Sequence, residues 1–227
     1  MKLPHGKPRI EKLQPAFSLI EMVAVMAILV TLMTAGVSLL SGTGVQSRKA
    51  ATDMLSGLIE QAKTRAITSR SCVILAIAEP GDLPSGDERC RIGMFRVDVE
   101  WPDASSPPVP LKCTLLSRWQ PLNTGVVLLA DDVNDNDVSI PNPLDASELN
   151  LEYGGAKNLN VKVHAIAFNT RGGLHYPSGS NPIAFRIAEG GYRGGKATAN
   201  TRGEKKKVTE NLLKIGRVTA RPYRIDG

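Results

Sequence analysis

The sequence AFSLIEMVAVMAILVTLMTAGVSLL, which covers residues 16–40, is the stretch on which the organisation of the chain depends. From Phe17 to Leu40 it is almost entirely apolar, and Glu21 is its one charged residue. An α-helix of about 20 apolar residues, rising about 1.5 Å per residue, covers the ~30 Å hydrocarbon core of a bilayer. This stretch therefore predicts a transmembrane helix over residues 17–40.

Residues 1–16, which precede this stretch, form a short basic leader. Its charged residues are four bases and one acid, namely Lys2, Lys7, Arg9, Lys12 and Glu11. Because positively charged flanks of a transmembrane helix stay on the cytoplasmic side, the carboxyl-terminal part of the chain is expected across the membrane. An ordinary secretory signal peptide, cut near residues 34–36, is the alternative. The length of the apolar stretch and the presence of Glu21 argue against that alternative.

Glu21 needs a physical explanation, because an ionised carboxylate at membrane depth costs roughly 2.5–3.5 kcal/mol on insertion scales. One explanation is its position in the first turn of the helix, where the positive end of the helix dipole favours a negative charge. The other is a partner that is not part of the same helix. Its spacing from Phe17 bears on that second explanation.

The segment Ala16-Phe17-Ser18-Leu19-Ile20-Glu21 resembles the processing motif of type IV prepilins and type II secretion pseudopilins. The family motif has a small residue before the cut, usually glycine, then phenylalanine, and glutamate after three more residues. The resemblance implies cleavage between Ala16 and Phe17 by a prepilin peptidase, with methylation of the new amino terminus. It also implies that the ammonium group of Phe17 pairs with Glu21 of a neighbouring subunit. Such a pair sets register more than it adds stability.

The resemblance also implies a location and a division of the chain. The expected protein is a single-pass protein of the bacterial inner membrane, with its carboxyl-terminal domain in the periplasm, which is later extracted into a filament. Residues 1–16 are the removed leader, and 17–40 are the transmembrane helix. Residues 41–70 continue the helix in amphipathic form, and 71–227 are the folded domain.

The pattern of residues 41–70 is that of an amphipathic helix, because apolar residues recur at spacings of three and four. These residues are Ala51, Met54, Leu55, Leu58, Ile59, Ala62, Ala66 and Ile67. The charged residues, Arg48 among them, are assigned largely to other faces. Two glycines, Gly42 and Gly44, cost roughly 1 kcal/mol each inside a helix and favour a bend or an unwound turn there.

From Cys72 onward the pattern changes to that of short strands separated by turns rich in proline, glycine and aspartate. The candidate strands are Cys72–Ala78, Ile92–Val99, Leu115–Trp119, Gly125–Leu129, Leu149–Tyr153, Val161–Phe168, Ile183–Ala188 and Leu212–Ile225. The predicted fold class is α+β and pilin-like. A long amino-terminal helix, transmembrane in its first half, packs on an antiparallel β-sheet domain.

Three further segments are similar to H-type minor pseudopilins and the related FimT-like minor pilins: Leu58–Ile67, Ala167–Gly173 and Leu213–Val218. The H-type resemblance implies a minor subunit of a type II secretion pseudopilus. Its partners would be the prepilin peptidase, other pseudopilins or pilins, the inner membrane and secreted protein cargo. The function expected of such a subunit is mechanical assembly.

The FimT-like resemblance implies a different partner, which is DNA taken up by the cell. The segment Gly216–Arg221 is similar to the basic carboxyl-terminal motif of that branch, although Thr219 stands where a second arginine belongs. Arg217, Arg221 and Arg224 would then contact phosphates, and release of counterions would strengthen the binding. The alternative is an ordinary basic surface.

The remaining chemistry-bearing residues are few. An oxidising compartment permits one disulfide among three cysteines; Cys90–Cys113 is the predicted pair, with Cys72 left over, and three free thiols are the alternative. The histidines of the folded domain stand in no nucleophile–base pattern, which predicts a protein that is not an enzyme. No cofactor is predicted, except that calcium is one interpretation of the acidic loop that follows residue 130.

That loop reads DDVNDND over residues 131–137. Oxygen ligands on alternate residues suit a hard cation, and the candidate ligands are Asp132, Asn134 and Asn136. The glycine and glutamate positions of an EF-hand loop are not met, since Asp137 and Pro143 stand there. A solvated acidic turn is the alternative.

Overall fold

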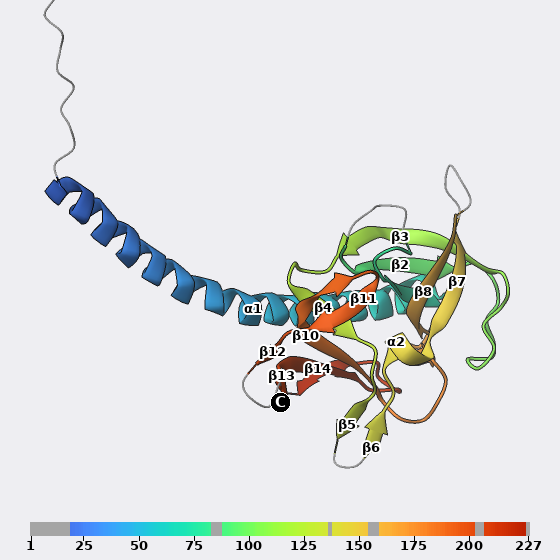
Figure 1. Ribbon diagram of the computed structural model, residues 1–227. Coiled ribbons are helices and arrows are strands. Elements are labelled where there is room, and N and C mark those ends of the chain that lie inside the picture. The colour runs from blue at the N-terminus through green and yellow to red at the C-terminus, as the bar shows by residue number, and fades with distance from the viewer. Residues whose placement is uncertain (1–18, 83–87, 136–137, 154–158, 203–206, 226–227) are drawn as a thin grey trace, which may run out of the picture. The chain divides into compact units, whose positions relative to one another are not determined.

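The structure is a computed structural model that describes residues 19–82, 88–135, 138–153, 159–202 and 207–225 (Figure 1). The chain divides into two units, Met1–Gly42 and Thr43–Gly227. The predicted cleavage site, Ala16 and Phe17, lies outside the described residues. So does the leader before it.

Helix α1 runs from Leu19 to Ser69 and contributes to both units. Its side chains are described over residues 19–29 and 44–69. Over the part of the chain that the structure describes, no helix combines the length and the apolar character that crossing a membrane requires. This finding overturns the predicted transmembrane helix over 17–40 and the predicted single-pass location in the inner membrane.

The helix continues through Gly42 and Gly44, where a bend or an unwound turn was expected. Gly44 has a different use. A Cβ atom built on it would lie 2.7 Å from Cδ of Glu189, closer than real Cβ atoms approach their neighbours. The absence of a side chain at Gly44 therefore makes room for a carboxylate that belongs to a distant strand.

Five strands of the second unit close on one another to form a small barrel. They are β1 (Val73–Ala78), β2 (Arg91–Val97), β3 (Leu111–Pro121), β7 (Glu148–Tyr153) and β8 (Leu159–Phe168), in this order, with β8 pairing back onto β1. The strand β9 (Leu174–Tyr176) adds to β8. All these pairs are antiparallel except β3 with β7, which is parallel.

The remaining strands form a second sheet and two hairpins. In the sheet, β11 (Lys196–Ala199), β10 (Ile183–Arg193), β14 (Glu210–Ile215) and β15 (Pro222–Ile225) are neighbours in that order, and β4 (Val126–Leu129) also pairs with β10. The hairpins are β5 (Val133–Asp135) with β6 (Val138–Ile140), and β12 (Thr201–Arg202) with β13 (Lys207–Val208). A short helix, α2 (Pro143–Ala146), begins at the cap Asn142.

Strand β1 shows how the two cores divide, because it is buried at every position. Successive side chains of a strand point to opposite faces. Val73, Leu75 and Ile77 belong to a core shared with α1 and the second sheet, whereas Ile74 and Ala76 belong to a second core. Since the first face meets the helix, the second core fills the barrel.

The core shared by α1, the barrel wall and the second sheet holds most of the buried apolar side chains. Helix α1 contributes a stripe at helical spacing: Ala51, Leu55, Leu58, Ile59, Ala62 and Ala66. The second sheet contributes Ile183, Phe185 and Ile187 from β10. Burying one such large side chain is worth roughly 1.5–3 kcal/mol, so this core joins the elements of the second unit.

The predicted fold class was wrong. The chain is mainly β, and its strands form a closed barrel and a separate sheet instead of one antiparallel sheet packed on a helix. The physical reason is the two-sided burial of β1. A strand in a sheet with one wet face alternates apolar and polar residues, whereas VILAIA is apolar throughout.

Candidate functional site

Three segments that are distant in sequence meet at the carboxyl-terminal end of α1. The β8–β9 turn packs on the helix, since a Cβ built on Gly172 would lie 2.7 Å from Cδ1 of Ile67. The same turn reaches the β14–β15 turn, where the Leu174 amide donates to the Arg217 carbonyl over 2.9 Å. The three segments overlap Leu58–Ile67, Ala167–Gly173 and Leu213–Val218, which are distant in the sequence and which the fold brings together.

The β8–β9 turn is built by Asn169. Its Oδ1 atom accepts hydrogen bonds from the amides of Arg171 and Gly173, each over 3.0 Å. Gly172 has φ +80°, a conformation that glycine adopts without steric cost. A Cβ on Gly173 would lie 3.1 Å from the Val218 carbonyl. The sequence Asn-Thr-Arg-Gly-Gly therefore makes a turn that packs closely on both neighbours.

Arg217 holds a second loop in place. Its guanidinium donates to the backbone carbonyls of Pro177 and Asn181 and, over 3.2 Å, to that of Ser178. Burial lowers the pKa of this arginine. Because the guanidinium is occupied by carbonyls, Arg217 is not the exposed phosphate contact that the DNA-binding prediction requires. Arg221 and Arg224 are exposed, and their role in DNA binding stays a prediction.

The meeting point is mainly basic. The stretches 61–78, 169–188 and 211–225, which come together there, include no aspartate or glutamate, and Glu60, just before the first of them, pairs with Lys63. The basic residues of these stretches at or next to the meeting point are Lys63, Arg65, Arg70, Arg171, Arg217 and Arg221. Sequence reasoning considered only the last of the three segments as basic, because the others become neighbours only in the fold.

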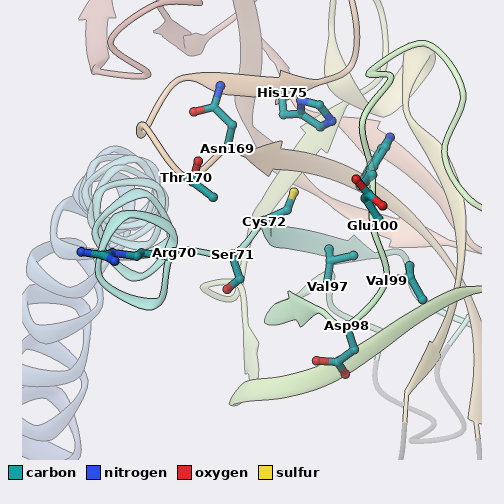
Figure 2. Close-up of a pocket in the computed structure, with 11 residues that line it drawn as sticks. Arg70, Ser71, Cys72, Val97, Asp98, Val99, Glu100, Asn169, Thr170 and His175 are labelled. Carbon is teal, nitrogen blue, oxygen red and sulfur yellow. The ribbon is translucent and has the colours of Figure 1, made fainter.

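A pocket of about 380 Å³ opens beside the β8–β9 turn (Figure 2). Cys72, just before β1, and His175, in β9, line it together with Asn169 and Thr170 of the turn, and Arg70 points away from the others. The His175 ring stands edge-on to Trp101 with centroids 5.2 Å apart, and its Nε2 atom is buried with no hydrogen-bond partner among the described residues.

The pocket does not favour nucleophilic chemistry. Burial raises the pKa of the Cys72 thiol to about 12, and burial lowers the pKa of His175. Both groups are therefore neutral near pH 7, and a neutral thiol is a poor nucleophile. Within the described ranges, no three histidine, cysteine, aspartate or glutamate side chains are grouped so as to hold a metal ion.

The predicted Cys90–Cys113 disulfide is wrong, because all three cysteines are free. Cys113 pairs with Val97 at one end of the β2–β3 ladder, whereas Cys90 precedes the opposite end of β2. At ~3.3 Å per residue the two lie roughly 20 Å apart, and a disulfide needs Cα atoms ~4.4–6.8 Å apart. Their thiols also belong to different cores.

The calcium candidates are only partly described. Asp132 accepts hydrogen bonds from the Asn142 amide over 2.9 Å and from the Ser139 hydroxyl over 3.2 Å, so both its carboxylate oxygens already have protein partners. Asn134 lies in β5, paired with Ser139, and Asn136 lies outside the described residues. Calcium binding stays a prediction.

Glu21, the predicted assembly residue, lies in the first turn of α1. Its predicted partner, the amino group of Phe17, lies outside the described residues. The pairing between subunits therefore stays a prediction.

Sequence reasoning missed a buried polar cluster between α1 and the second sheet. Arg48 donates to Oε1 of Glu189, Oδ1 of Asn211 and the Thr209 carbonyl, each over 3.1 Å. The amide of Asn211 in turn donates to the Thr52 hydroxyl over 3.0 Å. Arg48 is only 7% exposed and Glu189 5%. The signal was present, because Arg48 precedes Ala51 and Leu55 by three and seven residues and so shares their face.

Comparison of this chain with protein-family models, curated proteins and solved structures found no match.

Proposed function

We propose that this chain is a structural subunit of a helical filament, and specifically a minor pseudopilin of a type II secretion machine. The observation that supports the proposal most directly is the apolar surface of α1 in the first unit. The sequence resemblance at residues 16–21 supports the same assignment.

Large apolar side chains cover α1 between Leu19 and Leu29. Leu19 is 83% exposed, and the others are exposed as well: Ile20, Met22, Val23, Val25, Met26, Ile28 and Leu29. They do not form a stripe but surround the helix, and a helix that is apolar all round is normally buried on every side. Exposed apolar patches of this kind mark sites of association. Helices of neighbouring subunits, packed around this one, supply such an environment.

Glu21 gives this association a defined register. After cleavage, the ammonium group of Phe17 on a neighbouring subunit would pair with the Glu21 carboxylate among these apolar helices. Displacing the neighbour along the helix would leave both charges buried and unpaired, which is strongly unfavourable. The pair thus selects one arrangement, while the apolar side chains supply most of the stabilisation. The folded unit then remains available to cargo or to other subunits, and no catalytic step is assigned to it.

The experiment that tests this proposal is identification of the mature amino terminus in cells with and without a prepilin peptidase. The protein is purified from both strains and its terminal peptide is analysed by mass spectrometry. We expect a peptide that begins at methylated Phe17, present only when the peptidase is present. A terminus near Gly36, or an uncut Met1 in both strains, would contradict the proposal.

A second measurement tests the register role of Glu21. The variant Glu21→Gln keeps the size of the side chain and removes its charge, so we expect normal cleavage but loss of co-purification with the other filament subunits. A matched control, Asp53→Asn, removes an exposed carboxylate from the second half of the same helix and should leave co-purification unchanged. If the two changes had equal effects, the loss would not be specific to Glu21.

A further inference from the structure

The end of α1 and the two turns that meet it form a surface of unusual composition. We name it the junction surface and define it by Lys63, Ile67, Arg70, Arg171, Val218 and Arg221. Two of these residues are apolar and exposed, Ile67 at 46% and Val218 at 87%. Gly172 and Gly173 lie between them, because the first packs against Ile67 and the second against the Val218 carbonyl.

The basic residues of the junction surface have few acidic neighbours. The stretches on which these residues lie, 61–78, 169–188 and 211–225, contain no carboxylate side chain. Glu60, one turn earlier on α1, pairs with Lys63 over 3.5 Å, and Asp98, beside the pocket, pairs with Arg96 over 3.0 Å. Glu100 lines the neighbouring pocket. Arg70, Arg171 and Arg221 are exposed and stand on the segments that lack acids.

The backbone under the junction surface is fixed before any partner arrives. Asn169 closes one turn through two hydrogen bonds, and Arg217 ties the other turn to the loop at residues 177–181. A preformed surface loses little conformational entropy on association, and this improves affinity. Basic residues that only contact solvent would not require a backbone held by these hydrogen bonds, whereas a binding surface benefits from it.

We propose that the junction surface docks an acidic protein surface, in which carboxylates surround one or more apolar side chains. Protein interfaces place apolar residues at the centre with polar residues at the rim, and they are enriched in arginine and depleted in lysine. The junction surface has a matching composition, with Ile67 and Val218 as its exposed apolar residues and three arginines against one lysine. A nucleic-acid backbone would use the charges and leave the apolar side chains exposed.

This inference rests on the proposed function in one respect, namely that the partner is a protein of the same filament. Arginines facing carboxylates mainly set specificity and the rate of association, while the apolar centre holds the complex together. The contribution of the charges and that of the apolar side chains to binding can therefore be measured separately, by changing the two kinds of residue independently.

The test is photo-crosslinking from the full chain in its native cells, with p-benzoylphenylalanine at Val218. The matched control carries the same group at Val109, which is 95% exposed and outside the junction surface. We expect one discrete protein adduct from position 218, absent from position 109, whose crosslinked peptide contains aspartate or glutamate.

Charge reversal supplies the decisive comparison. The double variant Arg171→Glu with Arg221→Glu changes only exposed side chains, so an unchanged melting temperature shows that it folds. It should lower the yield of the adduct by about tenfold or more, and Arg171→Lys with Arg221→Lys should not. Changing the crosslinked acidic residues of the partner to lysine should restore the yield with the reversed variant.

Three results would overturn the proposal: an adduct that charge reversal leaves unchanged, no adduct beyond that of the control position, or crosslinking to nucleic acid. These outcomes are separate from the test of filament function. If an acidic partner is crosslinked in cells where Phe17 is not processed, the docking proposal stands and the filament proposal fails. If Phe17 is processed but no adduct forms, the filament proposal stands and the docking proposal fails.

Discussion

The two halves of α1 place apolar side chains in opposite environments. Between Leu19 and Leu29 the large apolar residues are exposed, whereas between Ala51 and Ala66 they are buried against the barrel and the second sheet. Both halves belong to one continuous helix. The difference therefore arises from the distribution of apolar residues around the helix and not from secondary structure.

In the second half the apolar residues follow a helical stripe, and the other faces carry polar residues such as Asp53, Glu60 and Lys63. One face can then be buried within the chain while the rest stays in water. The first half has no polar face, so burial by its own domain would cover only part of it. The comparison teaches that periodic apolar residues are buried by the fold, whereas an apolar segment without a period stays exposed and is the surface to which we assign association.

The largest effect should come from the polar contact that anchors the second half. Arg48→Met removes the guanidinium that pairs with the buried Glu189 carboxylate, and removing one member of a buried pair costs about 3–5 kcal/mol of unfolding free energy. Denaturant unfolding of the full chain, followed by the fluorescence of Trp101 and Trp119, measures the change.

A matched control for this prediction is Lys162→Met, which breaks an exposed pair with Glu148. An exposed pair is typically worth less than ~1 kcal/mol, so the control should be nearly neutral. If Arg48→Met were as mild, apolar packing alone would hold α1 in place. The double change Arg48→Met with Glu189→Leu should recover much of the loss, since apolar replacement of a buried pair is often neutral.

The next effect compares the two halves directly. Ile59 is fully buried, and Ile59→Ala should lower the free energy of unfolding by about 2–5 kcal/mol through lost burial and a cavity. Met26 is exposed, and Met26→Ala should change the unfolding of the folded unit by less than ~0.5 kcal/mol. The same variant should weaken association with other subunits. A large loss of stability in Met26→Ala would show that the first half is also part of the fold.

A substitution at Gly44 tests whether the contact of α1 with the second sheet already begins at this residue. Gly44→Ala would place a methyl group 2.7 Å from the Glu189 carboxyl carbon, so the carboxylate that pairs with Arg48 must shift. Overpacking of this kind costs about 1–3 kcal/mol, which the better helix propensity of alanine offsets by roughly 0.5–1 kcal/mol. Chemical denaturation again measures the loss. Pairing the change with Glu189→Ala, which removes the clash, should make its additional cost disappear, and a cost that persists would point to the helix itself.

Local sequence patterns predicted many of the strands but not how they join. The candidate strands at residues 72–78, 161–168 and 183–188 lie within one or two residues of β1, β8 and the first part of β10. Closure of the barrel depends on β1 pairing with both β2 and β8 and on a parallel contact between β3 and β7. These are long-range choices of register, and a single sequence contains no direct signal for them.

The candidate site shows the same limit at the level of side chains. The sequence marked Arg217 as basic, but its role depends on carbonyls 36 to 40 residues away that the fold brings to it. The burial of Arg48 could have been predicted from the sequence, because its spacing from Ala51 and Leu55 places it on the buried face of the helix. Composition gives the charge of a residue, whereas its availability follows from tertiary contacts.

The smallest effect has the opposite sign and concerns Gly57. This glycine lies on an exposed face of the second half of α1, and a Cβ atom built on it would meet nothing within 4 Å. Glycine inside a helix is less favourable than alanine by roughly 0.5–1 kcal/mol, so Gly57→Ala should stabilise the folded unit by about that amount. The shift is measurable as a higher denaturation midpoint with an unchanged slope. If the change stabilised the isolated chain but reduced its incorporation into filaments, the face around Gly57 would belong with the first half of α1 as a contact between subunits. Destabilisation of the isolated chain would instead mean that another part of the same chain already covers this face.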